Sequence, residues 1–180
     1  NYATHMVTLN VKDNSYLEFI PEQIIPYKKS RFYQKTNLVI DDSSTVVYSE
    51  TIVPGRIAMG EMFDFDVCFL KTEGKINDRI QFRDSSLLSP KTQKIESLAM
   101  FDDKTILTSV YILTKKHLTK IKDMVDELFS HTQTITGGSS ILPNDSGISI
   151  RILGNSSEDQ KTTIYEIIKI IRKEILPDYL

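Results

Sequence analysis

The sequence predicts a mainly β protein whose C-terminal part is α+β. Two observations carry this prediction. Up to Leu113 the apolar residues recur mostly at every second position, in short runs rich in Val, Ile, Thr, Tyr and Phe, as in half-buried strands. After Leu113 the spacing becomes that of amphipathic helices. We therefore expect one domain over residues 1–180, with layered β-sheets in a β-rich region of 1–114 and two amphipathic helices packed on a sheet in 115–180.

The predicted strands of the β-rich region lie between clusters of turn-forming residues, which are KDNS, DDSS, PGR, EGKIND and FDDK. No helix-period stretch of useful length interrupts them, so they favour a layered or barrel-like architecture. The strand runs, in chain order, are MVTLNV, YLEFI, TNLVI, STVVYSETIV, FDFDVCFL, RIQF and TILTSVYILT.

The tail reads as strand, helix, strand, strand, helix. Apolar residues at helical spacing predict a first helix over 115–130 and a second over 157–175. Ser157 and Gln160 form a candidate capping box at the start of the second helix, and Pro177 follows its end. Between the helices, the runs QTITGG and GISIRIL predict two strands joined across LPND.

The segment YSETIVPGRIAMGEMFDFD, residues 48–66, is predicted to form strand, turn, strand. Pro54 ends the first apolar run, and a second alternating run starts at Glu61. Gly55 and Gly60 stand where the backbone needs positive φ or a close approach. Two interpretations stay open from the residues alone. The segment is either a hairpin with a solvated rim, because turns attract such residues, or a functional site.

Two carboxylates of this segment, Glu50 and Glu61, flank Arg56. Strand alternation would place Glu61 on the same face as Phe63 and Phe65. A buried carboxylate needs a cation, a backbone donor or an arginine. Glu50 and Glu61 could converge on a transient site for a divalent ion, whereas the simpler alternative is a Glu–Arg pair that fixes the turn.

Composition excludes several classes of protein. Hydrophobic residues make up 40% and charged residues 26% of the 180 residues, which suffices for a packed core. The net charge is -2 with Lys and Arg scattered, so nucleic acid is not an expected partner. No transmembrane helix or signal peptide is expected. The single cysteine, Cys68, is expected to be a buried apolar residue, and it favours a cytoplasmic setting.

Motifs for catalysis are missing from the sequence. His5, His117 and His131 lie far apart in the chain and have no metal-ligand spacing, so structural roles are expected for them. Gly137-Gly138 before Ser139-Ser140 lacks the lysine of a phosphate-binding loop and is interpreted as a bend or bulge in a strand. We expect a protein that is not an enzyme.

Two motif strings resemble the UreD/UreH family of urease accessory proteins: LEFIPEQIIPYKKSRFYQ, and SETIVPGRIAMGEMF followed by LLSPKT. Order and spacing agree over about half of the chain. The positions that match the family pattern are Leu17, Glu18, Pro21, Ile25, Pro26, Phe32, Gln34, Glu50, Pro54, Gly55, Arg56, Gly60, Glu61 and Phe63.

The chain departs from the family pattern in two respects. Gln23 stands where the family often has Pro. The Gly-Gly-Gly-Asp-like and Thr/Ser-Gln-Ala segments of the family's N-terminal part are absent, and the chain opens on Asn1. We therefore expect a fragment that corresponds to the C-terminal two-thirds of a family member.

The resemblance implies a non-catalytic, cytoplasmic scaffold in urease maturation. It implies a helical UreF-type partner, a UreG-type GTPase recruited through that partner, and delivery of nickel to apo-urease through an internal tunnel. No tightly bound cofactor is implied, only nickel in transit. Glu50 is the first candidate for a tunnel-lining carboxylate, with Glu61 and Arg56 next, and Pro54, Gly55 and Gly60 would shape the motif.

Two other classes of function stay open. The chain could be a β-rich protein–protein interaction module without a metal role. It could also be a hydrolase that uses Glu50 and Glu61 as an acid–base pair, which would require both carboxylates around one pocket.

Overall fold

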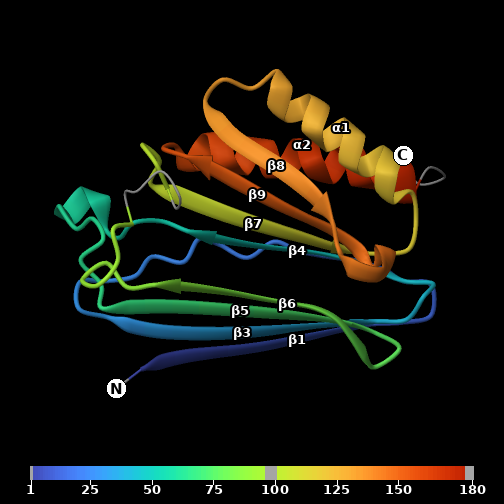
Figure 1. Cartoon of the computed structure of the whole chain (residues 1–180), viewed down its shortest axis with the longest axis horizontal. Helices are drawn as coiled ribbons and strands as arrows, with labels where there is room; N and C mark the ends of the chain where they lie inside the picture. The colour runs from blue at the N-terminus through green and yellow to red at the C-terminus, as the bar shows by residue number, and fades with distance from the viewer. Residues whose placement is uncertain (1, 96–100, 177–180) are drawn as a thin grey trace.

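The protein is built from three layers, seen edge-on in Figure 1: two helices, a five-stranded sheet and a four-stranded sheet. The computed structural model describes residues 2–95 and 101–176. The strands are β1 (Ala3–Val11), β2 (Tyr16–Phe19), β3 (Arg31–Ile40), β4 (Thr45–Ile52), β5 (Val67–Ile76), β6 (Arg79–Leu88), β7 (Ile106–Leu113), β8 (Ile135–Ile141) and β9 (Gly147–Gly154). The helices are α1 (Leu118–Ser130) and α2 (Ser157–Ile175), with short 3-10 turns η1 (Ile57–Met59) and η2 (Pro143–Asp145).

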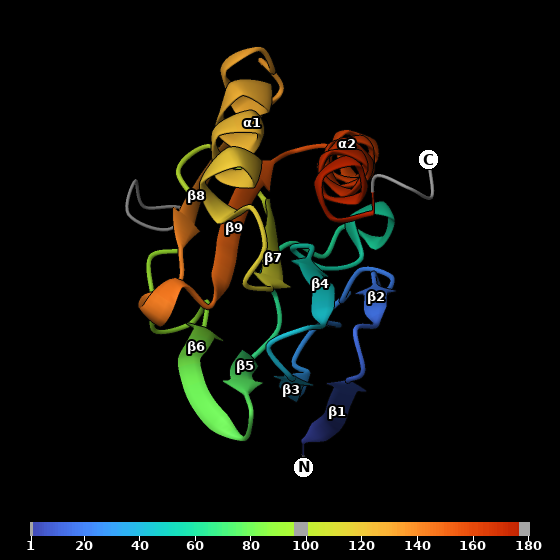
Figure 2. The same ribbon diagram turned by 90° about the vertical axis from the view of Figure 1, so that its right-hand side faces the viewer.

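The first five strands alternate between the two sheets. β1, β3 and β5 are parallel neighbours in the four-stranded sheet, and β2 and β4 are parallel neighbours in the five-stranded sheet. The chain thus adds strands to the two sheets alternately, as Figure 2 shows in a view from the end of the strands. The remaining strands pair antiparallel, in the orders β1-β3-β5-β6 and β2-β4-β7-β9-β8.

Both faces of the five-stranded sheet are covered, which explains why β4 is buried along its whole length. Its outer face packs on α1 and α2 through a cluster that includes Val47, Val110 and Ile150. Its inner face meets the four-stranded sheet. The bidentate ion pair of Arg172 with Glu18 (Nε–Oε1 2.8 Å, Nη2–Oε2 2.6 Å) additionally ties α2 to β2.

The predicted mainly β fold with an α+β tail is confirmed, as are the layered sheets and the two helices on one face of a sheet. Three details differ. α2 is capped by Ser156, whose side chain accepts from the N–H of Asp159, and not by Ser157. The first helix begins at Leu118, because His117 before it has left-handed backbone angles. Pro177 lies outside the described residues.

The predicted strand from Glu61 is wrong, and so is the hairpin. β5 begins only at Val67 and belongs to the other sheet, so β4 and β5 do not pair. The intervening segment contains η1, and Phe63 has a φ of 54°, which no strand permits. The alternating apolar residues of this segment fill the inter-sheet core, where Phe65 is fully buried, without forming a strand.

The predicted bend at Gly137-Gly138 is also wrong. Both residues lie in regular β8 and pair in unbroken register with Ile152 and Arg151 of β9. A Cβ on Gly137 would collide with the ring of Phe129 from α1. Glycine is therefore required here for the close packing of a helix on a strand.

Candidate functional site

A row of polar side chains crosses the space between the two sheets. On the five-stranded sheet, Glu50, Ser109 and Arg151 are register partners on neighbouring strands. On the facing sheet, Thr36, Thr72 and Asp84 form the corresponding row on β3, β5 and β6. We call these residues, together with Gln34 of β3, the polar layer.

Apolar clusters bound the polar layer on both sides. Along β4, Tyr48 belongs to one cluster and Ile52 to the other, with Glu50 between them. Along β7, Tyr111 and Leu107 flank Ser109 in the same way. The polar layer thus interrupts an otherwise apolar inter-sheet core.

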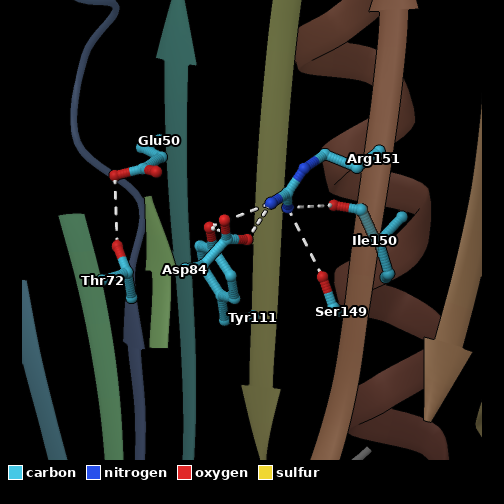
Figure 3. Close-up of polar contacts among 7 residues, drawn as sticks. All are labelled: Glu50, Thr72, Asp84, Tyr111, Ser149, Ile150 and Arg151. Atoms are coloured by element: carbon cyan, nitrogen blue, oxygen red, sulfur yellow. Dashed lines mark hydrogen bonds and ion pairs between the residues drawn. The ribbon is translucent and has the colours of Figure 1, made fainter. Parts of the chain in front are cut away.

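Glu50 is the most buried charged residue of the polar layer, with a residue exposure of 4%. Three donors reach its Oε2: the hydroxyl of Tyr48 at 3.0 Å, Nε2 of Gln34 at 3.3 Å and Oγ1 of Thr72 at 3.4 Å. Two of these donors come from the facing sheet, and Figure 3 shows the Thr72 contact. The carboxylate is therefore held at a fixed position by both sheets.

The other carboxylate oxygen of Glu50 faces a different environment. Within the part of the chain that the structure describes, every hydrogen bond to this carboxylate ends on Oε2 and none on Oε1. Glu50 also lines a cavity of about 510 Å³ at the β1–β2 side of the molecule, with Gln34, Tyr48 and His5. His5 extends the polar contacts outward, because its Nδ1 lies 3.0 Å from Oε1 of Gln34. The site can thus offer one oxygen of a fixed carboxylate to a cation.

The electrostatic setting of Glu50 is that of a charge removed from water. Burial raises the pKa of the Glu50 carboxyl above its ordinary value, although hydrogen bonds from Tyr48 and Gln34 and the charge of Arg151 oppose this rise. Burial, together with the Glu50 charge, also raises the pKa of the Tyr48 phenol. Tyr48 thus remains a donor to the carboxylate at any physiological pH.

Glu61 has a different role, in the turn after β4. It forms a bidentate ion pair with Arg56, with an Nε–Oε2 distance of 2.9 Å, and accepts a hydrogen bond from the N–H of Lys28 at 3.2 Å. The guanidinium also stacks over Tyr27, 4.3 Å from the ring centroid. Arg56 lowers the pKa of the Glu61 carboxyl. Glu61 and Arg56 thereby fasten the turn to the segment 20–30.

The glycines of the turn have the predicted positive φ angles. Gly55 has a φ of 142° and Gly60 a φ of 72°. A Cβ on Gly55 would lie 3.0 Å from the carbonyl oxygen of Glu61, so both angle and space require glycine there. The carbonyl of Pro54 accepts from the N–H of Phe63 at 2.7 Å and closes the same turn.

The structure brings Arg56 and Glu61 together and leaves Glu50 elsewhere. The cavity that Glu50 lines does not include Glu61 among its lining residues. The Glu–Arg pair offered as the simpler alternative is therefore present, whereas an acid–base pair of Glu50 and Glu61 around one pocket is not observed. This separation removes the basis for the hydrolase alternative.

The surroundings of the remaining candidate residues indicate structural roles. Cys68 is buried as predicted, and burial raises the pKa of its thiol to about 12. His131 caps α1 and donates its N–H to Leu128. Among residues 2–95 and 101–176, no group of three or more His, Cys, Asp or Glu is placed to hold a metal ion. In the same ranges, neither helix has the length and apolar character needed to cross a membrane.

Sequence analysis missed three other members of the polar layer. Thr72, Asp84 and Arg151 were not singled out, although a signal exists. Each is a polar residue at an inward position of its strand, with an apolar residue two positions away on the same face: Leu70, Phe82 and Leu153. A search for polar residues that interrupt the inward face of successive strands would have found the layer.

The fold and the site together define a β-rich protein with a hydrogen-bonded carboxylate between two sheets and no assembled catalytic centre in the described residues. Comparison with known proteins identifies the family within this class. The model of the family described as UreD urease accessory protein matches residues 1–178. The chain belongs to the UreD family of urease accessory proteins, and because these are accessory proteins, the prediction that the chain is not an enzyme is confirmed.

Curated relatives agree with the family assignment. The urease accessory protein UreD of Cenarchaeum symbiosum is 33% identical over 160 residues, covering 88% of this chain and 56% of the relative. UreD 2 of Brucella canis is 32% identical and covers 97% of this chain and 59% of the relative. For UreD of Yersinia enterocolitica these values are 32%, 98% and 57%. The chain thus spans less than two-thirds of the length of these relatives.

Proposed function

We propose that this protein acts in urease maturation as a non-catalytic scaffold that passes nickel through the polar layer toward apo-urease. The observation that carries the proposal is Glu50: a buried carboxylate, fixed through Oε2, whose Oε1 has no donor among the described residues. Membership of a urease accessory family supports the choice of nickel as the ion.

The chemistry of the layer suits an ion in transit. Around Glu50, the oxygen ligands come from one carboxylate and from hydroxyl and amide groups, which bind nickel less strongly than imidazole or thiolate. A weak site releases its ion, so no tightly bound cofactor is proposed. Water in the cavity of about 510 Å³ would complete the coordination of the ion.

We assign Glu61 chiefly a structural role, in which it supports one wall of this cavity without lining it. Residues 21–27 line the cavity, and Glu61 and Arg56 hold that segment through Lys28 and Tyr27. Both oxygens of Glu61 are engaged by Arg56. A direct contact of Glu61 with nickel, as the resemblance implied, would require this ion pair to open.

The proposal includes a helical UreF-type partner, a UreG-type GTPase recruited through it, and apo-urease. Exposed apolar side chains support partner binding: Ile57 (53% exposed), Met59 (71%) and Met62 (49%) lie together on the turn after β4. The proposal also includes a cytoplasmic setting, which the single cysteine and the family resemblance favour.

The first test replaces Glu50 in cells that lack the endogenous homologue. We expect Glu50→Ala to lower urease activation several-fold while the UreF-type partner is still recovered by pull-down. Glu73→Ala is the matched control, because Glu73 is similarly buried on β5 but pairs with Arg83 and Lys75 outside the layer. Wild-type activation by Glu50→Ala would refute the nickel route through Glu50 and leave the alternative of an interaction module without a metal role.

A further inference from the structure

The polar layer ends at a cluster of Asp84, Tyr111 and Arg151, which we call the edge cluster. Arg151 of β9 forms an ion pair with Asp84 of β6, and Nη2 of Arg151 lies 3.3 Å from the Tyr111 hydroxyl. That hydroxyl donates to Oδ2 of Asp84 at 3.0 Å. Figure 3 shows Arg151 reaching toward Asp84 and Tyr111, with Glu50 and Thr72 on the opposite side of these two residues.

The edge cluster is the more open part of the layer. β6 is an edge strand, and its sheet is not hydrogen-bonded to β9, so side chains alone join the sheets at this point. The side chains of Arg151 and Asp84 are 36% and 29% exposed, whereas Glu50 is buried. A path along the layer from the β1–β2 cavity would therefore reach solvent at this cluster.

Arg151 opposes the passage of a cation in two ways. Its guanidinium places a positive charge in the layer, and that charge repels a second cation. It also occupies Asp84, the carboxylate at this end of the layer. An ion that arrives from Glu50 thus meets a carboxylate already neutralised by arginine.

Arg151 has other acceptors within reach. Its Nη1 lies 3.4 Å from Oγ of Ser149 and 3.5 Å from the carbonyl oxygen of Ile150 (Figure 3). These acceptors and solvent could keep the guanidinium hydrogen-bonded after it has left Asp84. The exchange would leave each charge with a partner, because the arriving ion takes the carboxylate that arginine releases.

We propose that Arg151 closes the far end of the layer by holding Asp84, and that a divalent cation opens it by displacing Arg151 from this carboxylate. Asp84 is then the second carboxylate of the route, after Glu50. The inference rests on the proposed function, since it takes nickel as the ion that travels along the layer. It adds a position for the ion and a reason why that position is closed at rest.

Equilibrium dialysis of the purified protein against Ni²⁺ tests this inference. We expect Arg151→Gln to bind nickel about tenfold more tightly than wild type, a change equivalent to about 1.4 kcal/mol. The double variant Arg151→Gln/Asp84→Asn should return to the wild-type affinity. Arg83→Gln is the matched control, because Arg83 lies next to Asp84 on β6 but pairs with Glu73 outside the layer; it should change nothing.

An unchanged nickel affinity in Arg151→Gln, or an affinity gain that persists in the double variant, would overturn the inference. If Arg151→Gln does not fold, Arg151→Lys replaces it. A lysine lacks the planar fork that reaches Asp84 and Tyr111 together, so a smaller gain in affinity is expected, and no gain would again overturn the inference.

The two proposals fail separately. Glu50→Gln in the activation assay decides whether nickel uses the layer at all. Impaired activation by Glu50→Gln, with no change of nickel affinity in Arg151→Gln, removes only the role of Arg151. Full activation by Glu50→Gln removes the nickel route itself.

Discussion

At the scale of single residues, the ionised form of Glu50 lowers the stability of the fold, and the hydrogen bonds from its neighbours do not fully compensate. All three hydrogen bonds converge on one oxygen, and burial still raises the pKa of the carboxyl. Each unit of pKa shift is worth about 1.4 kcal/mol. A residue that weakens the fold in its charged form is a candidate for function, because a purely structural role would be met better by a neutral side chain.

We predict that Glu50→Gln stabilises the protein at neutral pH. Glutamine keeps an acceptor for Tyr48 and Thr72 without a buried charge. Because the folded-state pKa is raised, the ionised carboxyl costs stability above that pKa, and the cost disappears as pH falls toward the ordinary value of 4.5. The melting temperature of the variant should exceed that of wild type at pH 7–8, by about 2–4 °C for each kcal/mol, and the difference should shrink toward acid pH.

Thermal melting of both proteins from about pH 8 to 5 checks this prediction. Glu73→Gln provides the opposite sign, because the pKa of Glu73 is lowered by Arg83 and Lys75 and its charge is therefore stabilising above the ordinary value. A Glu50→Gln variant that melts below wild type at pH 7 would contradict our account of the Glu50 environment.

At the scale of elements, strand β8 shows how the packing of a helix limits the size of a residue on the strand beneath it. Gly137 and Gly138 are adjacent in sequence and regular in backbone, yet only Gly137 lies under the Phe129 ring. We predict that Gly137→Ala lowers the free energy of unfolding by about 1–3 kcal/mol, since an extra methyl overpacks the contact. Gly138→Ala, with open space around its Cβ, should be neutral or stabilising by up to about 1 kcal/mol.

Denaturant unfolding of the two variants measures this contrast. Equal effects of the two substitutions would show that α1 is not seated on β8 as the structure has it. The periodicity of the sequence could reveal the strand and the helix but not this contact, because it depends on how two elements lie in space. For the same reason the glycine pair was misinterpreted as a bend.

The segment between β4 and β5 illustrates a second limit at the element scale. Alternating Phe63 and Phe65 have the pattern of a strand, but a run of this length has no register until a neighbouring strand supplies one. The Arg56–Glu61 pair and the positive φ angles of Gly55 and Gly60 build a turn instead. The glycine positions and the ion pair were readable from the sequence, whereas the departure from strand geometry at Phe63 was not.

At the scale of the whole molecule, the sequence predicted the layers but not the path of the chain through them. A period of two tells which side chains share a face, without telling which sheet a strand joins. The alternation of β1 to β5 between two sheets is therefore a tertiary result. Glu50 could be selected from its motif, yet Thr72 faces it only through that alternation, and Arg151 and Asp84 join the polar layer only through the pairing of β9 with β7 and of β6 with β5.

The space between the two sheets serves two purposes that no single residue could serve at once. The apolar clusters on either side of the polar layer stabilise the packing of the sheets, and the layer between them keeps charges in a fixed position. In our proposal, Arg151 and Asp84 close the layer at one side of the molecule, and the cavity beside Glu50 admits the ion at the other. The apolar clusters would then keep the protein stable around the proposed route.

The most direct test of the central claim is the nickel content of urease purified from cells that carry Glu50→Gln in place of the wild-type protein. Because this variant is expected to be at least as stable as wild type at neutral pH, instability cannot explain a loss of function. Our account predicts urease with several-fold less nickel per active site, while Glu73→Gln leaves the content unchanged. Wild-type nickel content in urease from the Glu50→Gln cells would contradict the claim that nickel passes the buried carboxylate.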